Sequence, residues 1–168
     1  MPAKIYTIGH SNTKPEELLN KIKLYGIDTL VDVRSAPYSH YSPQFNKETI
    51  SFFCANNNIT YLFMGNLLGG KPKDNSVIDS NLTINYHKLS QKDYFFNGID
   101  KLIEISSNRI ICLMCSEGSP DKCHRNLLIA PALNKEGIEV LHILPNGLTE
   151  SPNELSLSKK HGQLVLFS

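Results

Sequence analysis

The segment from Cys115 to Arg125, Cys-Ser-Glu-Gly-Ser-Pro-Asp-Lys-Cys-His-Arg, gathers reactive side chains in one short stretch. It holds two thiols, carboxylates, an imidazole and a guanidinium. Residues 109–114 before it form an apolar run typical of a buried strand, and residues 126–133 after it have a helical pattern. The segment is therefore predicted to be a loop between a strand end and the electropositive start of a helix, which suits an anion or a polarised carbonyl.

Two cysteines of this loop are candidate catalytic nucleophiles. A thiol near Arg125 and a helix start is expected to have a lowered pKa, which favours the thiolate of Cys115 or Cys123. Either cysteine can equally be a small buried hydrophobe. Cys112 and Cys115 have the spacing of zinc ligands, but residues three apart on a strand point to opposite faces. We therefore expect no metal, and no other cofactor.

The charged residues of the loop can each have a functional or a structural role. Glu117 is a candidate acid/base group if the cleft excludes water, because burial raises the pKa of a carboxyl toward neutrality; alternatively it only holds Arg125 in place. Arg125 is predicted to bind a phosphate or carboxylate, with a structural pair to Asp32 as the alternative. His124 is counted with the anion-binding residues.

Polar residues also follow the other expected strands. His10 is a candidate catalytic or ligand-binding group, whereas Ser11 and Asn12 can bind a ligand or only shape and cap the turn. Arg34 adds a cation after the second strand. The later candidates are Gly69, Gly70 and His142. The glycines permit close approach to a ligand, and the histidine can enter the cleft or stay buried in its strand. Carboxyl ends of parallel strands share one edge, so one cleft is expected to use most of these residues.

The order of expected elements is that of an alternating α/β domain. Strands are expected at residues 4–8, 27–33, 59–64, 109–114 and 139–144. Helices are expected at residues 14–25, 47–56, 91–106 and 126–133, with a long surface excursion at 65–85. This alternation predicts a Rossmann-like three-layer domain over residues 4–144, with a mostly parallel sheet and helices on both faces.

Composition restricts the classes of partner. A chain of 168 residues with a formal charge of +1 favours one domain and argues against a protein that coats nucleic acid. Any nucleic-acid contact is expected to be local or made through a partner. The first residues lack a signal-peptide pattern, and no apolar stretch approaches the roughly 20 residues needed to cross a bilayer. These features predict a cytoplasmic protein without membrane contact, whose cysteines are thiols.

Several short motifs resemble a known family. They are Thr7-Ile-Gly-His-Ser-Asn12, Asp32-Val-Arg34, Leu68-Gly-Gly70, Cys115-Ser-Glu117, Cys123-His-Arg125 and His142. In this order, over about residues 4 to 144, they resemble the family named for domain of unknown function 488. The resemblance implies a compact Rossmann-like α/β domain. It implies no particular activity, because none is securely attached to the family.

The last residues of the chain carry a separate signal. After residues 145–162, which are expected to form a linker, Gln163-Leu-Val-Leu-Phe167 resembles the pentapeptide with which bacterial replication and repair proteins bind the DNA polymerase sliding clamp. In this mode apolar anchors enter a preformed groove and the glutamine supplies a hydrogen bond. The residues expected to contact the clamp are Gln163, Leu164, Leu166 and Phe167. The alternative is a terminal strand that packs on the domain.

Three classes of function remain open. The leading hypothesis is an enzyme acting on nucleotides or nucleic acid, in DNA repair or processing, which binds phosphate and reacts through Glu117, His10 or a cysteine. The second is a noncatalytic nucleotide- or DNA-binding module that recruits the clamp. The third is a rhodanese-like thiol or sulfur protein. Spacing counts against the third, because a phosphatase-like loop needs an arginine where this chain has Asp121.

Overall fold

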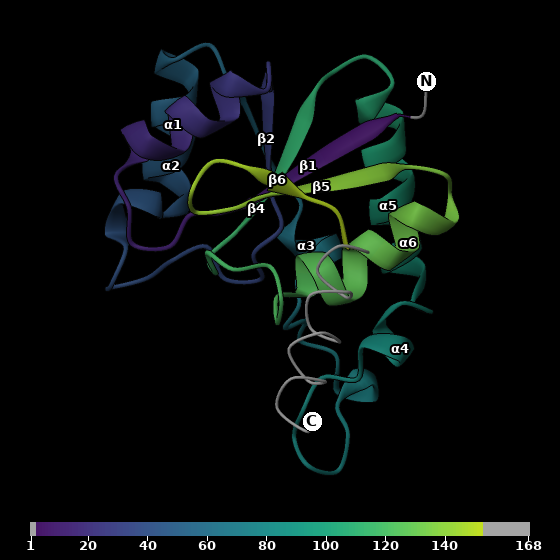
Figure 1. Ribbon diagram of the computed structural model, residues 1–168. Helices are drawn as coiled ribbons and strands as arrows, with labels where there is room; N and C mark the ends of the chain where they lie inside the picture. Colours follow the sequence, from purple (N-terminus) through teal and green to yellow (C-terminus); the bar gives the residue numbers. More distant parts are fainter. Residues whose placement is uncertain (1–2, 153–168) are drawn as a thin grey trace, which may run out of the picture.

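The computed structural model describes residues 3–152 and contains a six-stranded central sheet in the order β3-β2-β4-β1-β5-β6. The strands are β1 Lys4–Gly9, β2 Thr29–Asp32, β3 Thr60–Phe63, β4 Ile111–Cys115, β5 Glu139–Ile143 and β6 Thr149–Glu150. Strands β1 to β5 pair in parallel, whereas β6 pairs antiparallel with β5 (Figure 1). The structure confirms the predicted α/β class with a mostly parallel sheet.

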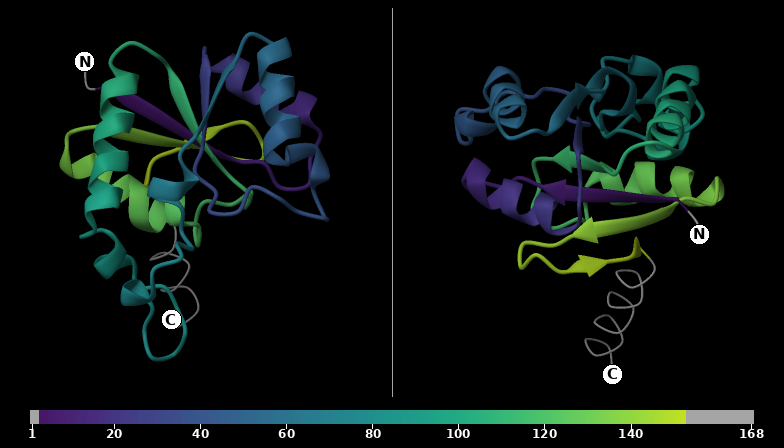
Figure 2. Two further views of the ribbon diagram at one scale, coloured as in Figure 1. Left: turned by 180° about the vertical axis from the view of Figure 1, so that it is seen from behind. Right: turned by 90° about the horizontal axis from the view of Figure 1, so that it is seen from above.

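Helices cover both faces of the sheet. They are α1 Pro15–Leu24, α2 Lys47–Asn56, α3 Gly65–Leu68, α4 Tyr86–Leu89, α5 Asp93–Ser106 and α6 Ala130–Lys135. Shorter turns are the 3-10 helices η1 Pro43–Phe45 and η2 Asn75–Val77 and the π-helix η3 Arg125–Ile129. Figure 1 shows α1 and α2 on one side of the sheet and α5 and α6 on the other, and Figure 2 shows the same layers from behind and from above.

Each face of the sheet has its own apolar core. Leu30 of β2 packs in the core beneath α1 and α2, and its neighbour Val31 packs in the core beneath α5 and α6. Strands β2 and β4 are buried along their whole length. Burial on both faces explains the continuously apolar sequence of β4, whereas β2 places the polar residues Thr29 and Asp32 at its two ends. Cys112 and Cys115 of β4 lie in different cores, as expected for residues three apart on a strand.

The segment 65–85 is more than a surface excursion. It contains α3 and η2, and its residues Leu68 and Val77 are fully buried. A Cβ added to Gly98 of α5 would lie 2.7 Å from Leu68, so α3 packs directly against α5. Elements of three or four residues are too short to show a periodicity, and the sequence pattern therefore did not predict them.

The helix after the reactive loop begins as a π-turn. Residues 126–133 were expected to form one helix, but η3 precedes α6 and the N–H of Ala130 bonds to the carbonyl of Arg125. Pro131 lies in the first turn of α6 and has no N–H to donate, which interrupts the regular α-helical ladder here. Such π-turns are frequent at functional sites.

Part of the expected linker also belongs to the sheet. Strand β6 pairs Glu150 with His142 through a hairpin, and Gly147 in its turn has a φ of 85°. A strand of two residues is too short to show an alternation of polar and apolar side chains. The sequence pattern therefore predicted a linker over all of residues 145–162. The candidate clamp-binding residues 163–168 lie outside the described residues. Within 3–152, no helix is long and apolar enough to cross a membrane.

Candidate functional site

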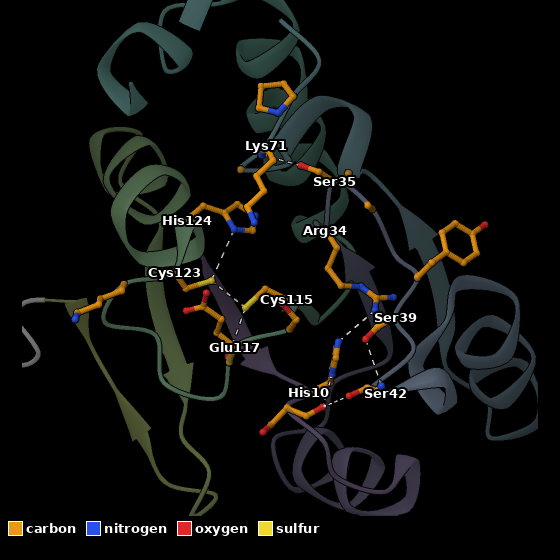
Figure 3. A pocket seen from close by; sticks show the side chains of 18 of the residues that line it. His10, Arg34, Ser35, Ser39, Ser42, Lys71, Cys115, Glu117, Cys123 and His124 are labelled. Carbon is orange, nitrogen blue, oxygen red and sulfur yellow. Dashed lines mark hydrogen bonds between the residues drawn. The ribbon is translucent and has the colours of Figure 1, made fainter. Parts of the chain in front are cut away.

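A cleft of about 770 Å³ lies at the carboxyl ends of β1, β2 and β4. These strands place His10, Arg34 and Cys115 on its lining. Cys123 and His124, from the loop before η3, complete the surface around Cys115. Figure 3 shows the two cysteines and His124 on one side of the cleft, and Arg34 and His10 on the other. Residues far apart in sequence meet here because parallel strands end at one edge.

One side of the cleft, which we call the thiol wall, consists of Cys115, Cys123 and His124. All cysteines of the chain are free thiols, and the Sγ atoms of Cys115 and Cys123 lie 3.0 Å apart. The Cys123 Sγ also lies 3.7 Å from Nδ1 of His124, whose Nε2 donates to the Val33 carbonyl over 3.0 Å. That second bond orients the ring, so a proton can pass between Nδ1 and the Cys123 sulfur.

The two thiols differ in acidity. Burial raises the pKa of Cys115, which is 2% exposed, and its contact with Cys123 raises that pKa further. The hydrogen bond from Cys115 lowers the pKa of Cys123, with further contributions from His124 and the backbone N–H of Arg125. Cys115 therefore keeps its proton, its S–H donates a hydrogen bond to the Cys123 sulfur, and Cys123 is the thiolate of the pair.

Arg125 shapes the loop that joins the two cysteines. Its side chain is fully buried, with Nη1 donating to Thr7 Oγ1 over 2.8 Å. Nη2 donates to the carbonyls of Glu117 and Gly118 over 3.0 and 2.9 Å. Arg125 is not among the residues that line the cleft, so the structure does not support its predicted anion-binding role. Its guanidinium instead satisfies backbone carbonyls that would otherwise be buried without donors.

Close backbone approaches at two glycines keep the thiol wall compact. A Cβ on Gly70 would lie 2.8 Å from the ring of His124, and one on Gly9 would lie 1.5 Å from the carbonyl oxygen of Glu117. Any larger side chain at these positions would displace the ring or the loop. Gly70 lines the cleft, whereas Gly69 does not and packs against Ser35. The structure thus places only one of the two glycines at the site.

The opposite side, which we call the guanidinium wall, consists of Arg34 and His10, and the fully buried Asp32 supports it from behind. Arg34 binds Asp32 bidentately, through Nε at 2.9 Å and Nη2 at 2.7 Å. Nη2 also donates to the Phe45 carbonyl at 2.8 Å, and Nη1 contacts His10 Nε2 at 3.2 Å. One of the five guanidinium N–H groups, on Nη1, is left without an acceptor among the described residues. Arg34 lines the cleft and is 7% exposed.

His10 supports Arg34. Its Nδ1 lies 2.6 Å from the Ser11 carbonyl, and its ring stacks on Phe45 with the centroids 4.4 Å apart. Burial lowers the pKa of His10 to about 4, so the ring is neutral at pH 7. The Nδ1–H then donates to Ser11 and Nε2 accepts from Arg34. Both ring nitrogens thus have partners, through which His10 contacts Arg34 and the Ser11 carbonyl, and its catalytic role stays a prediction. Ser11, with a φ of 49°, supplies the turn that allows this.

Two further predicted residues line the cleft in less central places. Glu117 is exposed on the rim, so the exclusion of water on which its acid/base role depends is not met. Asn12 uses its Oδ1 to accept from Gln44 Nε2 at 3.1 Å and from Ser42 Oγ at 3.3 Å. It therefore holds the turn after β1 to the segment before α2.

His142 lies outside the cleft. It is fully buried, 2.6 Å from Thr7 Oγ1 through Nδ1 and 3.2 Å from Asn126 Oδ1 through Nε2. Burial, followed by the nearby charge of Arg125, lowers its pKa to about 3. It is thus a neutral strand histidine that joins β5 to β1 and η3, the structural alternative considered from the sequence.

Comparison with known proteins identifies the family. The family model described as Domain of unknown function DUF488 matches residues 14–131. The chain belongs to the DUF488 family. The match includes Arg34, Gly70 and the whole thiol wall, and it begins after His10. No curated protein and no solved structure matches the chain. The activity of this DUF488 domain must therefore be inferred from its cleft.

The cleft of the DUF488 domain is more positive than the sequence indicated. Lys71, Lys73 and Lys122 line it together with Arg34, and Glu117 is the one carboxylate among the described lining residues. The whole chain carries only +1, so this positive charge is local. The sequence does not mark these lysines as site residues, because they lie in irregular segments, where no periodicity shows which side chains share a surface.

A metal-dependent role finds no support in the described part of this DUF488 chain. Across residues 3–152, no group of three His, Cys, Asp or Glu side chains is arranged to hold an ion. The reactive side chains of the cleft are the thiolate of Cys123, the thiol of Cys115 and the imidazole of His124. Their arrangement suits attack on an electrophilic atom of a negatively charged ligand.

Proposed function

We propose that the protein is an enzyme in which Cys123 acts as a nucleophile on an anionic substrate bound in the cleft. The observation that carries this proposal is the position of the Cys123 sulfur, 3.0 Å from Cys115 and 3.7 Å from His124, on the wall of a cleft lined by cations. Two neighbours that stabilise a thiolate make a cysteine reactive at neutral pH.

Charge and shape favour a phosphate-bearing substrate, for which we propose a nucleotide, free or at a nucleic-acid end. The lysines of the rim attract phosphate, and Arg34 offers its remaining N–H. Tyr38 and Tyr86 line the same cleft and offer ring faces for a base. A hydrogen bond of 2.9 Å from the Tyr38 hydroxyl to Glu48 holds one of these rings. The volume of the cleft is in the range of small-molecule sites.

The pH profile of alkylation tests the nucleophile. Iodoacetamide should modify Cys123 at a rate that changes less than about threefold between pH 6 and pH 9, because the thiolate is already formed. The rate for free cysteine rises about 200-fold over this range. Cys54 is a control within the chain, since burial raises its pKa to about 12. A Cys123 profile that follows free cysteine would remove the proposal.

Protection from alkylation tests the substrate class. Nucleoside monophosphates at millimolar concentration should slow the modification of Cys123 in the full chain, and the matching nucleosides should not. If inorganic phosphate protects Cys123 and nucleotides do not, the cleft binds anions but the proposal of a nucleotide substrate is wrong. If Cys123 is modified at the same rate with every ligand, the proposal of an anionic substrate is wrong.

For the tail we propose binding to the sliding clamp, and the support is the sequence of residues 163–167 alone. Calorimetric titration of a bacterial clamp should show binding by the full chain and none after truncation beyond Gly162. The truncated chain should keep the pH profile of Cys123, because Cys115, Cys123 and His124 all lie within the described residues 3–152. Absence of binding by the full chain would remove this proposal without affecting the one for the cleft.

A further inference from the structure

We propose that Cys123 and Cys115 act together as a dithiol that reduces disulfides of anionic low-molecular-weight thiols. This inference rests on Cys123 being the nucleophile, as proposed above. It adds a reacting role for Cys115, which otherwise serves only to stabilise the thiolate of Cys123. It also names a second class of anionic substrate for the same cleft beside the nucleotide, namely a disulfide whose organic groups carry carboxylate or phosphate.

The distance between the two sulfurs supports a dithiol. They lie 3.0 Å apart, and a disulfide bond is about 2.05 Å long, so closure needs a movement of about 1 Å. Cys115 ends β4, whereas Cys123 lies just before η3. The bonds from Arg125 to the carbonyls of Glu117 and Gly118 fold the intervening loop back, which brings these separate elements into contact.

The surroundings give the two sulfurs different roles. Cys123 has the stabilised thiolate and contacts His124, so it attacks first. Cys115 keeps its proton until a neighbouring sulfur becomes electrophilic, because burial disfavours its charged form. An attacking thiolate beside a deeper resolving thiol is the arrangement that thiol–disulfide exchange requires. Cys112 is on the opposite face of β4, in the other core, and cannot take either role.

The reaction balances in two steps. The Cys123 thiolate attacks one sulfur of R–S–S–R, the S–S bond breaks, and RS⁻ leaves as RSH with the proton from His124. The Cys115 sulfur then attacks Cys123 Sγ of the mixed disulfide, and the second RS⁻ leaves with the proton of Cys115. Two electrons pass from the dithiol to the substrate, which leaves a Cys115–Cys123 disulfide and two RSH. A dithiol reductant restores the starting state.

The charges of the cleft select the substrate. Lys71, Lys73 and Lys122 line the same cleft as the thiol wall. Arg34 lines the opposite side of that cleft (Figure 3). A carboxylate or phosphate on R gains from these cations while its sulfur reaches Cys123. A cationic disulfide of similar size meets like charge instead, and its reaction should be slower.

A single-turnover assay with glutathione disulfide tests the inference. The fully reduced wild-type chain, mixed anaerobically with this probe, should release two equivalents of glutathione, and peptide mapping should find Cys115 joined to Cys123. Cys115→Ala should release one equivalent and retain one glutathione on Cys123. Cys123→Ser should release none. Cys54→Ala, which changes a buried cysteine of α2 outside the cleft, should behave as wild type. Cystamine, a cationic disulfide, should react at least tenfold more slowly.

The outcomes separate this inference from the proposed function. Wild-type protein that retains glutathione on Cys123 and releases only one equivalent would overturn the dithiol, although Cys123 remained a nucleophile. The dithiol would also be overturned if the wild-type chain did not react with glutathione disulfide while the rate of Cys123 alkylation stayed independent of pH. A Cys123 profile like that of free cysteine would overturn both. Peptide mapping of the wild-type chain decides the connectivity even if a variant fails to fold.

Discussion

The two walls of the cleft are built from different kinds of contact. In the guanidinium wall Arg34 is held by a bidentate ion pair with Asp32, whose side chains are 8% and 0% exposed, and by His10. In the thiol wall, the hydrogen bonds given for the Cys123 side chain in the described structure both involve its sulfur, at 3.0 Å to Cys115 and 3.7 Å to His124. Charge-assisted bonds are strong and directional, whereas bonds to sulfur are weak. One wall is therefore rigid, and the other leaves a proton and a sulfur free to move.

This difference assigns binding and reaction to different strands. The carboxyl end of β2 holds a cation in one orientation, which fixes where a ligand anion can lie. The carboxyl end of β4 and the loop after it hold groups whose protonation depends on their neighbours. A substrate between the walls would be bound by one and attacked by the other, as expected when orientation and reactivity are supplied separately.

The largest expected effect comes from breaking the guanidinium wall. Arg34→Leu should lower the free energy of unfolding by about 3–5 kcal/mol, because it leaves the Asp32 carboxylate buried without its partner. Lys88→Met is the matched control, since its pair with Asp79 is 53% and 37% exposed and should contribute less than about 1 kcal/mol. Urea denaturation measures both. Equal small losses would show that the wall is not held by this pair.

A smaller effect concerns the acid stability of the same wall. Burial lowers the pKa of His10 to about 4, whereas an unfolded histidine titrates near its ordinary value of 6.5. As pH falls through this interval the unfolded chain takes up a proton that the folded chain does not, so stability decreases. The contribution of His10 to the loss by pH 4.5 should be about 2–3 kcal/mol, and the buried His142 adds a separate loss that His10→Gln leaves in place. Urea denaturation from pH 7 to 4.5 should give a flatter profile for His10→Gln, and an unchanged slope would contradict the assignment.

The smallest expected effect tests the packing of the thiol wall. Gly70→Ala should push the His124 ring away from Cys123, because the added Cβ would lie 2.8 Å from that ring. The rate of iodoacetamide modification at pH 6 should fall about tenfold as the thiolate loses a stabilising partner. Gly118→Ala is the control, since its Cβ would meet nothing closer than 3.6 Å. Equal rates in both variants would mean that His124 does not control Cys123.

The positions of the reactive residues were predictable to different degrees. Cys115 ends the buried strand β4, and Arg34 comes two residues after the buried strand β2. Their meeting at one edge of the sheet therefore followed from the predicted alternation of strands and helices. Arg125 was predicted at the same edge, but its side chain turns inward to Thr7 and to loop carbonyls. Arg34 comes after a strand and Arg125 begins a helical turn. No local sequence signal distinguishes a guanidinium that is buried in the protein from one that lines a cleft.

The amino-acid sequence by itself determined the alternation of strands and helices and the edge at which polar residues gather, because burial leaves local apolar patterns along the chain. Only the tertiary structure decided that Cys115 touches Cys123, that Arg34 lines the cleft while Arg125 does not, and that His10 is neutral. These properties depend on distances between residues that are distant along the chain. They also depend on which buried polar groups find partners, and no local pattern records either.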